Sequence, residues 1–245
     1  MPGYRQQTME WDIKTQLMYG CKIVALDGQG DLIWGHLTAR DPEQPDRLFM
    51  KPAAMGLEEI AVEDLIQIDL SGQKVGGERQ VHNEVFIHTE IMRRRPEVQC
   101  VVHTHAPWAV AFGSLEQPLV PVGHEGSLFA DGLPVFSQFT DLVVTPERGE
   151  AVASALGAHN AILLRNHGLV TCGTSIPEAV MTAVFLEKAC RVQMMAMAAG
   201  GPKAWTPPEE AQVKKQRIYR PWAFESAFRY LVRRIEEMES GRARS

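Results

Sequence analysis

The chain has 245 residues, enough for one domain with a complete hydrophobic core or at most two small ones. Its formal net charge of −5 argues against a nucleic-acid-binding protein, because such proteins usually carry a basic surface. No apolar run approaches the roughly 20 residues of a membrane helix, and the first residues lack the apolar segment of a secretory signal. Four cysteines without CxxC spacing indicate reduced thiols, and we expect a cytoplasmic protein.

The first half of the chain predicts a helix followed by short strands. An apolar stripe predicts a helix over residues 7–26, which ends at a glycine-rich turn. The predicted strands that follow cover residues 32–40, 47–52 and 65–70, the first two as antiparallel partners. Helical periodicity then returns over residues 82–95, with Asn83 as the N-cap and Pro96 after the last turn.

The second half alternates strands with longer helices. A strand rich in β-branched residues is predicted over 98–105, and a helix starts near Pro107. Residues 141–157 read as a strand end and a helix, and residues 160–175 as two strands around a tight turn. Two further helices are predicted over residues 176–200 and near 221–238. Strands alternating with helices over one core indicate a layered α/β fold.

Two histidines stand at the end of the predicted strand 98–105. Residues i and i+2 of a strand point to the same face, so His103 and His105 project together. Two imidazoles after a buried strand are costly unless they have partners, and a divalent ion that binds both ring nitrogens is one such partner. A hydrogen-bonded pair of histidines at a strand end is the alternative.

A metal ion needs further ligands, and His167 and Glu84 are the candidates. His167 lies in the turn between the two predicted strands of residues 160–175, where a histidine can also be a simple turn residue. Glu84 opens the helix at residues 82–95, where a carboxylate can instead complement the helix dipole.

Together these positions resemble the class II aldolase/adducin family, from about Thr8 to Arg191. The resemblance rests on a glutamate followed by "RRRPEVQCVVHTH", on "LLRNHGLV" and on "WGHLTAR" followed by "LFMKPAAMG". It implies a three-layer α/β/α fold with a central, mainly antiparallel sheet. We expect residues 1–245 to form a single domain of this type, with a C-terminal helical tail at about 203–245.

The resemblance also implies one divalent metal ion per subunit, held by His103, His105 and His167. Zinc and manganese suit such a site, and iron or cobalt can occupy it as well. The acidic residue of the family, a metal ligand or a general acid/base, falls on Glu84. Family members are commonly homotetramers with sites between subunits, so the C-terminal segment with Tyr219 can close a neighbour's site.

The family includes aldolases, epimerases, decarboxylases and non-catalytic adducin heads. Its aldolases bind phosphate at three places rich in hydroxyl groups, and those hydroxyl groups are nearly absent here, which indicates a non-phosphorylated substrate. Alternatively, Lys51 and Arg40 replace the lost contacts. The form "GHLTAR" with His36 resembles the decarboxylase branch. His124 falls near the position of the aldolases' tyrosine proton donor and can serve as the proton donor here.

We therefore expect a metal-dependent carbon–carbon lyase of aromatic compound catabolism. It removes CO₂ from a hydroxylated aromatic or ring-cleavage-product carboxylate through an enolate that the ion stabilises. The alternatives are an aldolase for a non-phosphorylated hydroxy-keto acid and a non-catalytic oligomerisation module. The expected catalytic residues are Glu84 and His124. The expected substrate contacts are His36, Lys51, Arg40, Arg79 and Tyr219.

Overall fold

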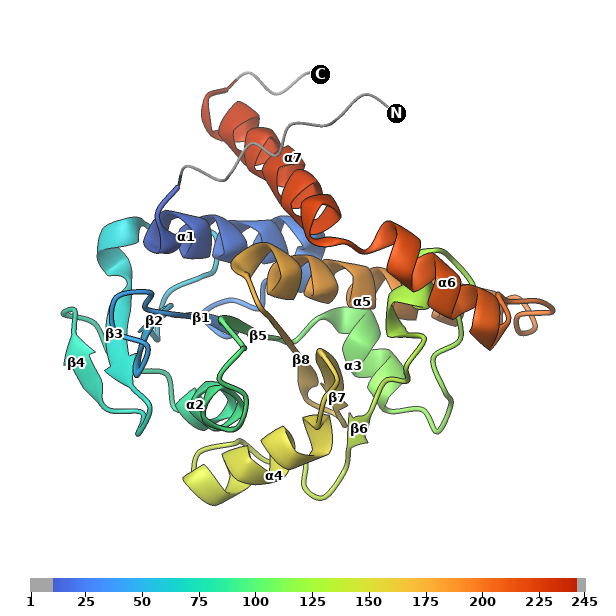
Figure 1. Cartoon of the computed structure of the whole chain (residues 1–245), viewed down its shortest axis with the longest axis horizontal. Helices are drawn as coiled ribbons and strands as arrows, with labels where there is room; N and C mark the ends of the chain where they lie inside the picture. The colour runs from blue at the N-terminus through green and yellow to red at the C-terminus, as the bar shows by residue number, and fades with distance from the viewer. Residues whose placement is uncertain (1–10, 242–245) are drawn as a thin grey trace.

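The computed structural model describes residues 11–241, and within them eight strands form one sheet (Figure 1). Their order is β4-β3-β2-β1-β5-β8-β7-β6, and only the pair β6–β7 is parallel. The strands are β1 (His36–Arg40), β2 (Arg47–Met50), β3 (Ile66–Asp69), β4 (Lys74–Gly76), β5 (Cys100–Thr104), β6 (Val135–Phe136), β7 (Ala161–Leu164) and β8 (Gly168–Gly173).

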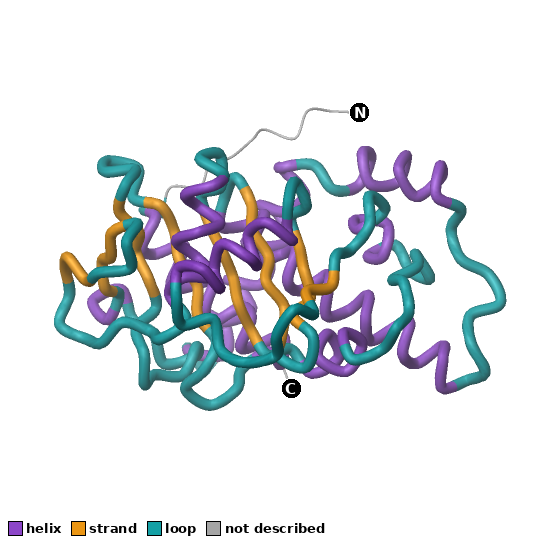
Figure 2. The backbone as a smooth tube through the Cα atoms, turned by 90° about the horizontal axis from the view of Figure 1, so that it is seen from below, coloured by secondary structure: helices purple, strands orange, loops and turns teal. Residues whose placement is uncertain are grey.

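Helices cover both faces of this sheet, as Figures 1 and 2 show from two directions. Helices α2 and α4 lie on one face, and α1, α3 and α5 lie on the other. Helix α7 packs outside α1 and α5, and α6 packs against the short 3-10 helix η3 (Glu125–Phe129). The helices are α1 (Ile13–Val24), α2 (Val85–Arg94), α3 (Pro107–Gly113), α4 (Pro146–Leu156), α5 (Ile176–Ala198), α6 (Pro208–Ile218) and α7 (Pro221–Glu239). None of these described helices is long and apolar enough to cross a membrane.

The alternation of side chains along the central strands produces two hydrophobic cores. In β5, Cys100 and Val102 pack with the apolar residues of α1 and α5, whereas Val101 packs with those of α2 and α4. His103 follows the parity of Val101 and therefore faces the α2 side of the sheet. The three-layer α/β/α architecture with a mainly antiparallel sheet is confirmed.

Two local expectations are wrong and one helix was not located, and each case has a physical cause. The helix predicted at 82–95 begins at Val85, so Glu84 and not Asn83 is its N-cap. No strand forms at the start of 141–157, because the backbone N–H of Val143 binds the carboxylate of Glu84 instead of a neighbouring strand. Helix α6 lies inside the helical tail expected at about 203–245, but its bounds were not predicted, since its sequence is mostly polar and buries only Ala211.

The first predicted helix begins later than its apolar stripe does. Helix α1 starts at Ile13, after the N-cap Asp12, whose carboxylate accepts a hydrogen bond from the N–H of Thr15 at 2.8 Å. Residues 7–10 of the predicted helix, and the start of the family resemblance at Thr8, lie outside the described residues.

Candidate metal centre

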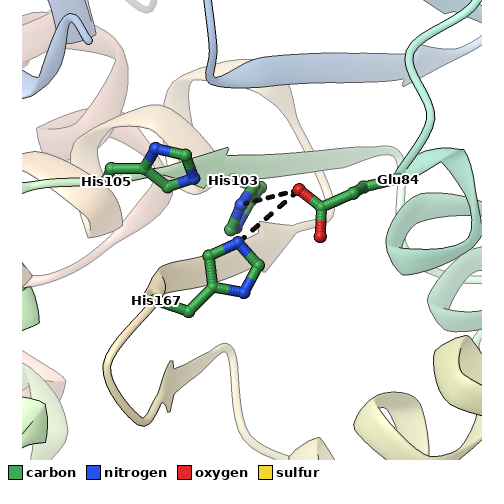
Figure 3. Close-up of side chains that lie close together, drawn as sticks. All are labelled: Glu84, His103, His105 and His167. Carbon is green, nitrogen blue, oxygen red and sulfur yellow. Dashed lines mark ion pairs between the residues drawn. The ribbon is translucent and has the colours of Figure 1, made fainter. Parts of the chain in front are cut away.

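Four predicted residues meet on the α2 side of the sheet. The ligand atoms of Glu84, His103, His105 and His167 all lie within 4.8 Å of one another. Each comes from a different place in the fold: the N-cap of α2, the interior of β5, the residue after β5, and the turn between β7 and β8. Figure 3 shows the imidazoles of His103 and His167 facing the carboxylate of Glu84, with His105 beside them.

The imidazoles present unused nitrogen atoms to the centre of this cluster. The Nε2 atoms of His103, His105 and His167 are buried and have no hydrogen-bond partner. The Nδ1 atom of His103 lies 2.9 Å from the carbonyl oxygen of Leu169, which can only accept. This nitrogen therefore carries the proton, and Nε2 of His103 keeps its lone pair. Buried lone pairs that converge without a partner are the donor set that a divalent metal ion requires.

The turn that carries His167 is shaped by its neighbours. Asn166 has a positive φ of 57°, a conformation that asparagine tolerates better than most residues. A Cβ atom on Gly168 would lie 2.4 Å from the backbone oxygen of Thr104, so only glycine lets β8 approach β5 this closely. The sequence "NHG" therefore places His167 against the end of the HTH segment.

Glu84 provides the negative charge of the cluster. Its Oε2 lies 3.5 Å from Nε2 of His167 and 3.9 Å from Nε2 of His103, while Oε1 accepts a hydrogen bond from the N–H of Val143 at 2.9 Å. Burial would raise the pKa of the Glu84 carboxyl, but the nearby imidazoles of His167 and His103 and the N–H of Val143 outweigh burial and lower it to about 2. The carboxylate is therefore ionised at neutral pH.

A second group of histidines lies beside the four-residue cluster. Nδ1 of His36 is 2.6 Å from Nε2 of His88, whose Nδ1 is 2.8 Å from the hydroxyl of Thr38. Nε2 of His36 is buried without a partner, and the ring of His82 lies 3.9 Å away between centroids. Burial, with His82 and His88 nearby, holds the pKa of His36 well below its ordinary range. His36 is thus a neutral imidazole that borders the cluster.

A pocket of about 410 Å³ opens above Glu84 and His105. Its other walls are mostly apolar, and Ile33, Trp34 and Leu142 are the large side chains among them. All three of these side chains are partly exposed, at 43%, 45% and 47%. The lining contains no serine, threonine, lysine or arginine.

The three predicted cationic contacts lie in other surroundings. The guanidinium of Arg40 is at the end of β1 opposite His36, where it donates to the backbone carbonyls of Val98 and Met92 at 3.2 and 2.9 Å. Because backbone carbonyls already bind its guanidinium, we do not retain Arg40 as a substrate contact. The partly exposed side chain of Arg79 forms an ion pair with Asp64 at 2.6 Å.

Lys51 is fully buried, and its ammonium donates to the carbonyl of Ile33 at 2.8 Å. Burial lowers the pKa of Lys51 to about 8. Because Ile33 lines the pocket, Lys51 supports the pocket wall from behind and is not itself part of the lining.

His124 and Tyr219 meet each other away from the cluster. The hydroxyl of Tyr219 donates to the backbone carbonyl of His124 at 2.8 Å. Neither residue belongs to the four-residue cluster or to the pocket above it within one chain. His124 and Tyr219 therefore stay predictions as site residues.

Sequence reasoning missed two residues of the site. Asp31 accepts a hydrogen bond from His105, and His82 lines the pocket. Asp31 is 74 residues from His105 along the chain, so no local motif reveals the contact. His82 is the first residue of the segment 82–95 that was predicted as helical, and no spacing signal marks it as a site residue.

Comparisons with known proteins agree with this fold. A family model described as the Class II Aldolase and Adducin N-terminal domain matches residues 15–194. Decarboxylase NovR from Streptomyces niveus is 37% identical over 190 residues, which cover 77% of this chain and 70% of that protein. The 3,4-dihydroxyphthalate decarboxylase of a Terrabacter species is 32% identical over 206 residues, covering 78% and 83%.

A solved structure gives the same result. The L-fuculose 1-phosphate aldolase from Glaciozyma antarctica superposes with a TM-score of 0.83 at 31% identity, covering 95% of this chain and 92% of that one. The family model alone spans well over half of the chain. The chain belongs to the class II aldolase and adducin family.

Proposed function

We propose that the protein is a divalent-metal-dependent decarboxylase. Its substrate is a non-phosphorylated, hydroxylated aromatic carboxylate or a ring-cleavage product of similar chemistry. The observation that carries this proposal is the set of three buried, unpartnered Nε2 atoms beside an ionised carboxylate at the floor of an apolar pocket. Two relatives whose names include decarboxylase, at 37% and 32% identity, support it.

The donor set fits the ion that the family uses. His103, His105 and His167 would hold it, with Glu84 as a further ligand or as the acid/base beside it. When bound, a divalent ion supplies a Lewis acid that stabilises negative charge on a substrate oxygen. Three imidazoles suit zinc and also accept manganese, iron or cobalt.

The pocket supports the substrate class. Ile33, Trp34 and Leu142 offer apolar walls against which a flat ring can lie, and the volume of about 410 Å³ is in the range of small-molecule sites. A phosphate group needs several donors to replace its hydration, but the lining has no hydroxyl or cationic side chain. The hydroxyl of Thr38, the nearest candidate on β1, is already bound to His88.

Glu84 is the residue that transfers the proton in the proposed reaction. Because its carboxyl group is ionised, Glu84 first takes the proton of the substrate hydroxyl. Glu84 then passes this proton to the ring carbon that bears the carboxylate, and the hydroxyl oxygen becomes a carbonyl. The bond between that carbon and the carboxylate breaks, CO₂ leaves, and the electron pair moves to the carbonyl oxygen, which becomes a phenolate. Glu84 is then ionised as at the start, and solvent protonates the phenolate.

A neighbouring subunit offers the alternative proton donor. His124 lines neither the cluster nor the pocket of its own chain, so we assign its role to the homotetramer that we propose from the family resemblance. Tyr219, which hydrogen-bonds the backbone of His124, would approach the same neighbouring site. The oligomeric state measured by light scattering tests this part of the proposal.

Aldol cleavage is the second candidate, because the chain is 31% identical to an L-fuculose 1-phosphate aldolase of the same fold. The two reactions differ in the released fragment. The test incubates metal-loaded protein with ortho-hydroxylated aromatic dicarboxylates and, separately, with hydroxy-keto acids. We expect CO₂ release that a chelator abolishes. Release of aldehyde or pyruvate without CO₂ would instead establish the aldolase.

A further inference from the structure

The loop between α1 and β1 reaches the metal centre through Asp31. Its Oδ2 atom lies 2.8 Å from Nδ1 of His105. His105 is the first residue after β5, so the strand ladder does not hold it, and its side chain is 21% exposed. Among the described residues, Asp31 provides the hydrogen bond that orients this imidazole.

The imidazole of His103 is held in a different way from that of His105. It lies inside β5, its side chain is fully buried, and its Nδ1 binds the backbone carbonyl of Leu169 on the adjacent strand. The core and the sheet therefore fix His103 without help from any side chain. His105 has neither support, so its position depends on a side chain that can be replaced.

The loop that carries Asp31 is itself anchored to the same strand end. The side-chain oxygen of Gln29 accepts a hydrogen bond from the hydroxyl of Thr104 at 2.7 Å, and the Gln29 side chain is almost fully buried. Gln29 also donates to Asp27 at 2.8 Å. The loop thus forms hydrogen bonds with two successive residues: Gln29 binds Thr104, and Asp31 binds His105.

We propose that Asp31 is a positioning residue that sets the affinity of the cluster for its divalent ion. A carboxylate that accepts the Nδ1 proton of His105 fixes the tautomer in which Nε2 keeps its lone pair, and it makes that nitrogen a stronger ligand. The inference depends on the metal site but not on decarboxylation. Its failure and the failure of the proposed reaction are therefore separate results.

The experiment measures binding of Zn²⁺ to the metal-free chain by competition with a chelating dye. Loss of such a carboxylate typically weakens metal binding about 10- to 100-fold, and we expect this for Asp31→Ala. Asp31→Asn keeps an acceptor oxygen but loses the charge, so it should fall between Asp31→Ala and the wild type. Asp31→Glu should restore most of the affinity.

Asp27→Asn is the matched control, because Asp27 belongs to the same loop but contacts Gln29 and no imidazole. It should bind Zn²⁺ within about twofold of the wild type. The visible absorption of bound Co²⁺ provides a second readout, since a misoriented His105 changes the ligand field. We expect the Co²⁺ bands to change in Asp31→Ala and to stay unchanged in Asp27→Asn.

Three results would overturn the inference. One is a Zn²⁺ affinity of Asp31→Ala within about twofold of the wild type. Another is an equal loss in Asp27→Asn, which would mean that the loop as a whole matters and not the carboxylate. The third is a folded wild-type chain that binds neither Zn²⁺ nor Co²⁺, because the metal site itself would then be absent. Circular dichroism of each variant confirms folding.

Discussion

The imidazoles of His36 and His88 are joined by a hydrogen bond of 2.6 Å between Nδ1 and Nε2, and both rings are fully buried. The other nitrogen of His88 meets the hydroxyl of Thr38 on β1. The position of the proton on one ring therefore determines its position on the other. It also determines whether the free Nε2 of His36, at the edge of the cluster, carries a proton or keeps its lone pair. Both rings must be neutral for this arrangement, since a buried imidazolium would have no water around it.

Acid should destabilise the chain through His88. Burial, together with His82, lowers the pKa of His88 in the folded state from 6.5 to about 3, despite the opposing effects of Glu84 and a hydrogen bond with Val101. The unfolded chain binds a proton below about pH 6.5 and the folded chain does not. The contribution of His88 to stability is thus complete above pH 6.5 and falls as the pH drops toward 3, by at most about 1.4 kcal/mol per pH unit.

Urea unfolding of the metal-free protein between about pH 4.5 and 7 measures this slope. His88→Gln removes the titrating group and should flatten the dependence by up to the stated amount. A slope for His88→Gln equal to that of the wild type would show that His88 is protonated equally in both states.

Replacing Glu84 should separate catalysis from folding. Glu84→Gln keeps the size of the side chain and an oxygen for the N–H of Val143, but it cannot carry a proton between substrate atoms. We expect the rate of CO₂ release to fall by about 10²- to 10⁴-fold, with part of the bound metal retained. Glu90→Gln is the control, because Glu90 is also buried on α2 but pairs with Arg93. Undiminished turnover in Glu84→Gln would rule out the acid/base role.

Replacing His103 should remove the metal. His103→Ala deletes the one of the three imidazoles that the sheet holds most firmly, and it leaves the remaining two on separate segments. We expect both bound metal and turnover to be lost after dialysis, as elemental analysis and a CO₂ assay would show, with the circular dichroism of a folded protein. His159→Ala, outside the cluster, should retain both. Full metal content in His103→Ala would contradict the ligand assignment.

Part of the cluster could be anticipated from local rules. Strand alternation sets His103 and His105 on one side, whereas the resemblance to the family was needed to add His167 and Glu84 to them. The partners of the imidazoles could not be anticipated, since the contacts of Asp31 with His105 and of His88 with His36 join residues 74 and 52 positions apart. Arg40 resembled a substrate ligand for the same reason: nothing nearby in the sequence reveals that backbone carbonyls already bind it.

Glu187 on α5 stabilises the helix that follows the HTH segment. Its carboxylate accepts hydrogen bonds from the backbone N–H groups of Trp108 and Ala109, at 2.9 and 2.8 Å, at the start of α3. Glu187 is only 6% exposed, so Glu187→Ala leaves these two N–H groups without a partner in a buried place. We expect the free energy of unfolding to fall by about 1–3 kcal/mol, as measured by urea denaturation.

Two further variants make this test specific to the hydrogen bonds. Glu187→Gln keeps one acceptor oxygen and should lose less stability than Glu187→Ala. Glu209→Ala, at an exposed site in the first turn of α6, removes a carboxylate without burying unpaired groups and should change stability by less than about 0.5 kcal/mol. If Glu187→Ala were as stable as Glu209→Ala, water would have to replace the lost acceptor, and the start of α3 would be more accessible than its burial indicates.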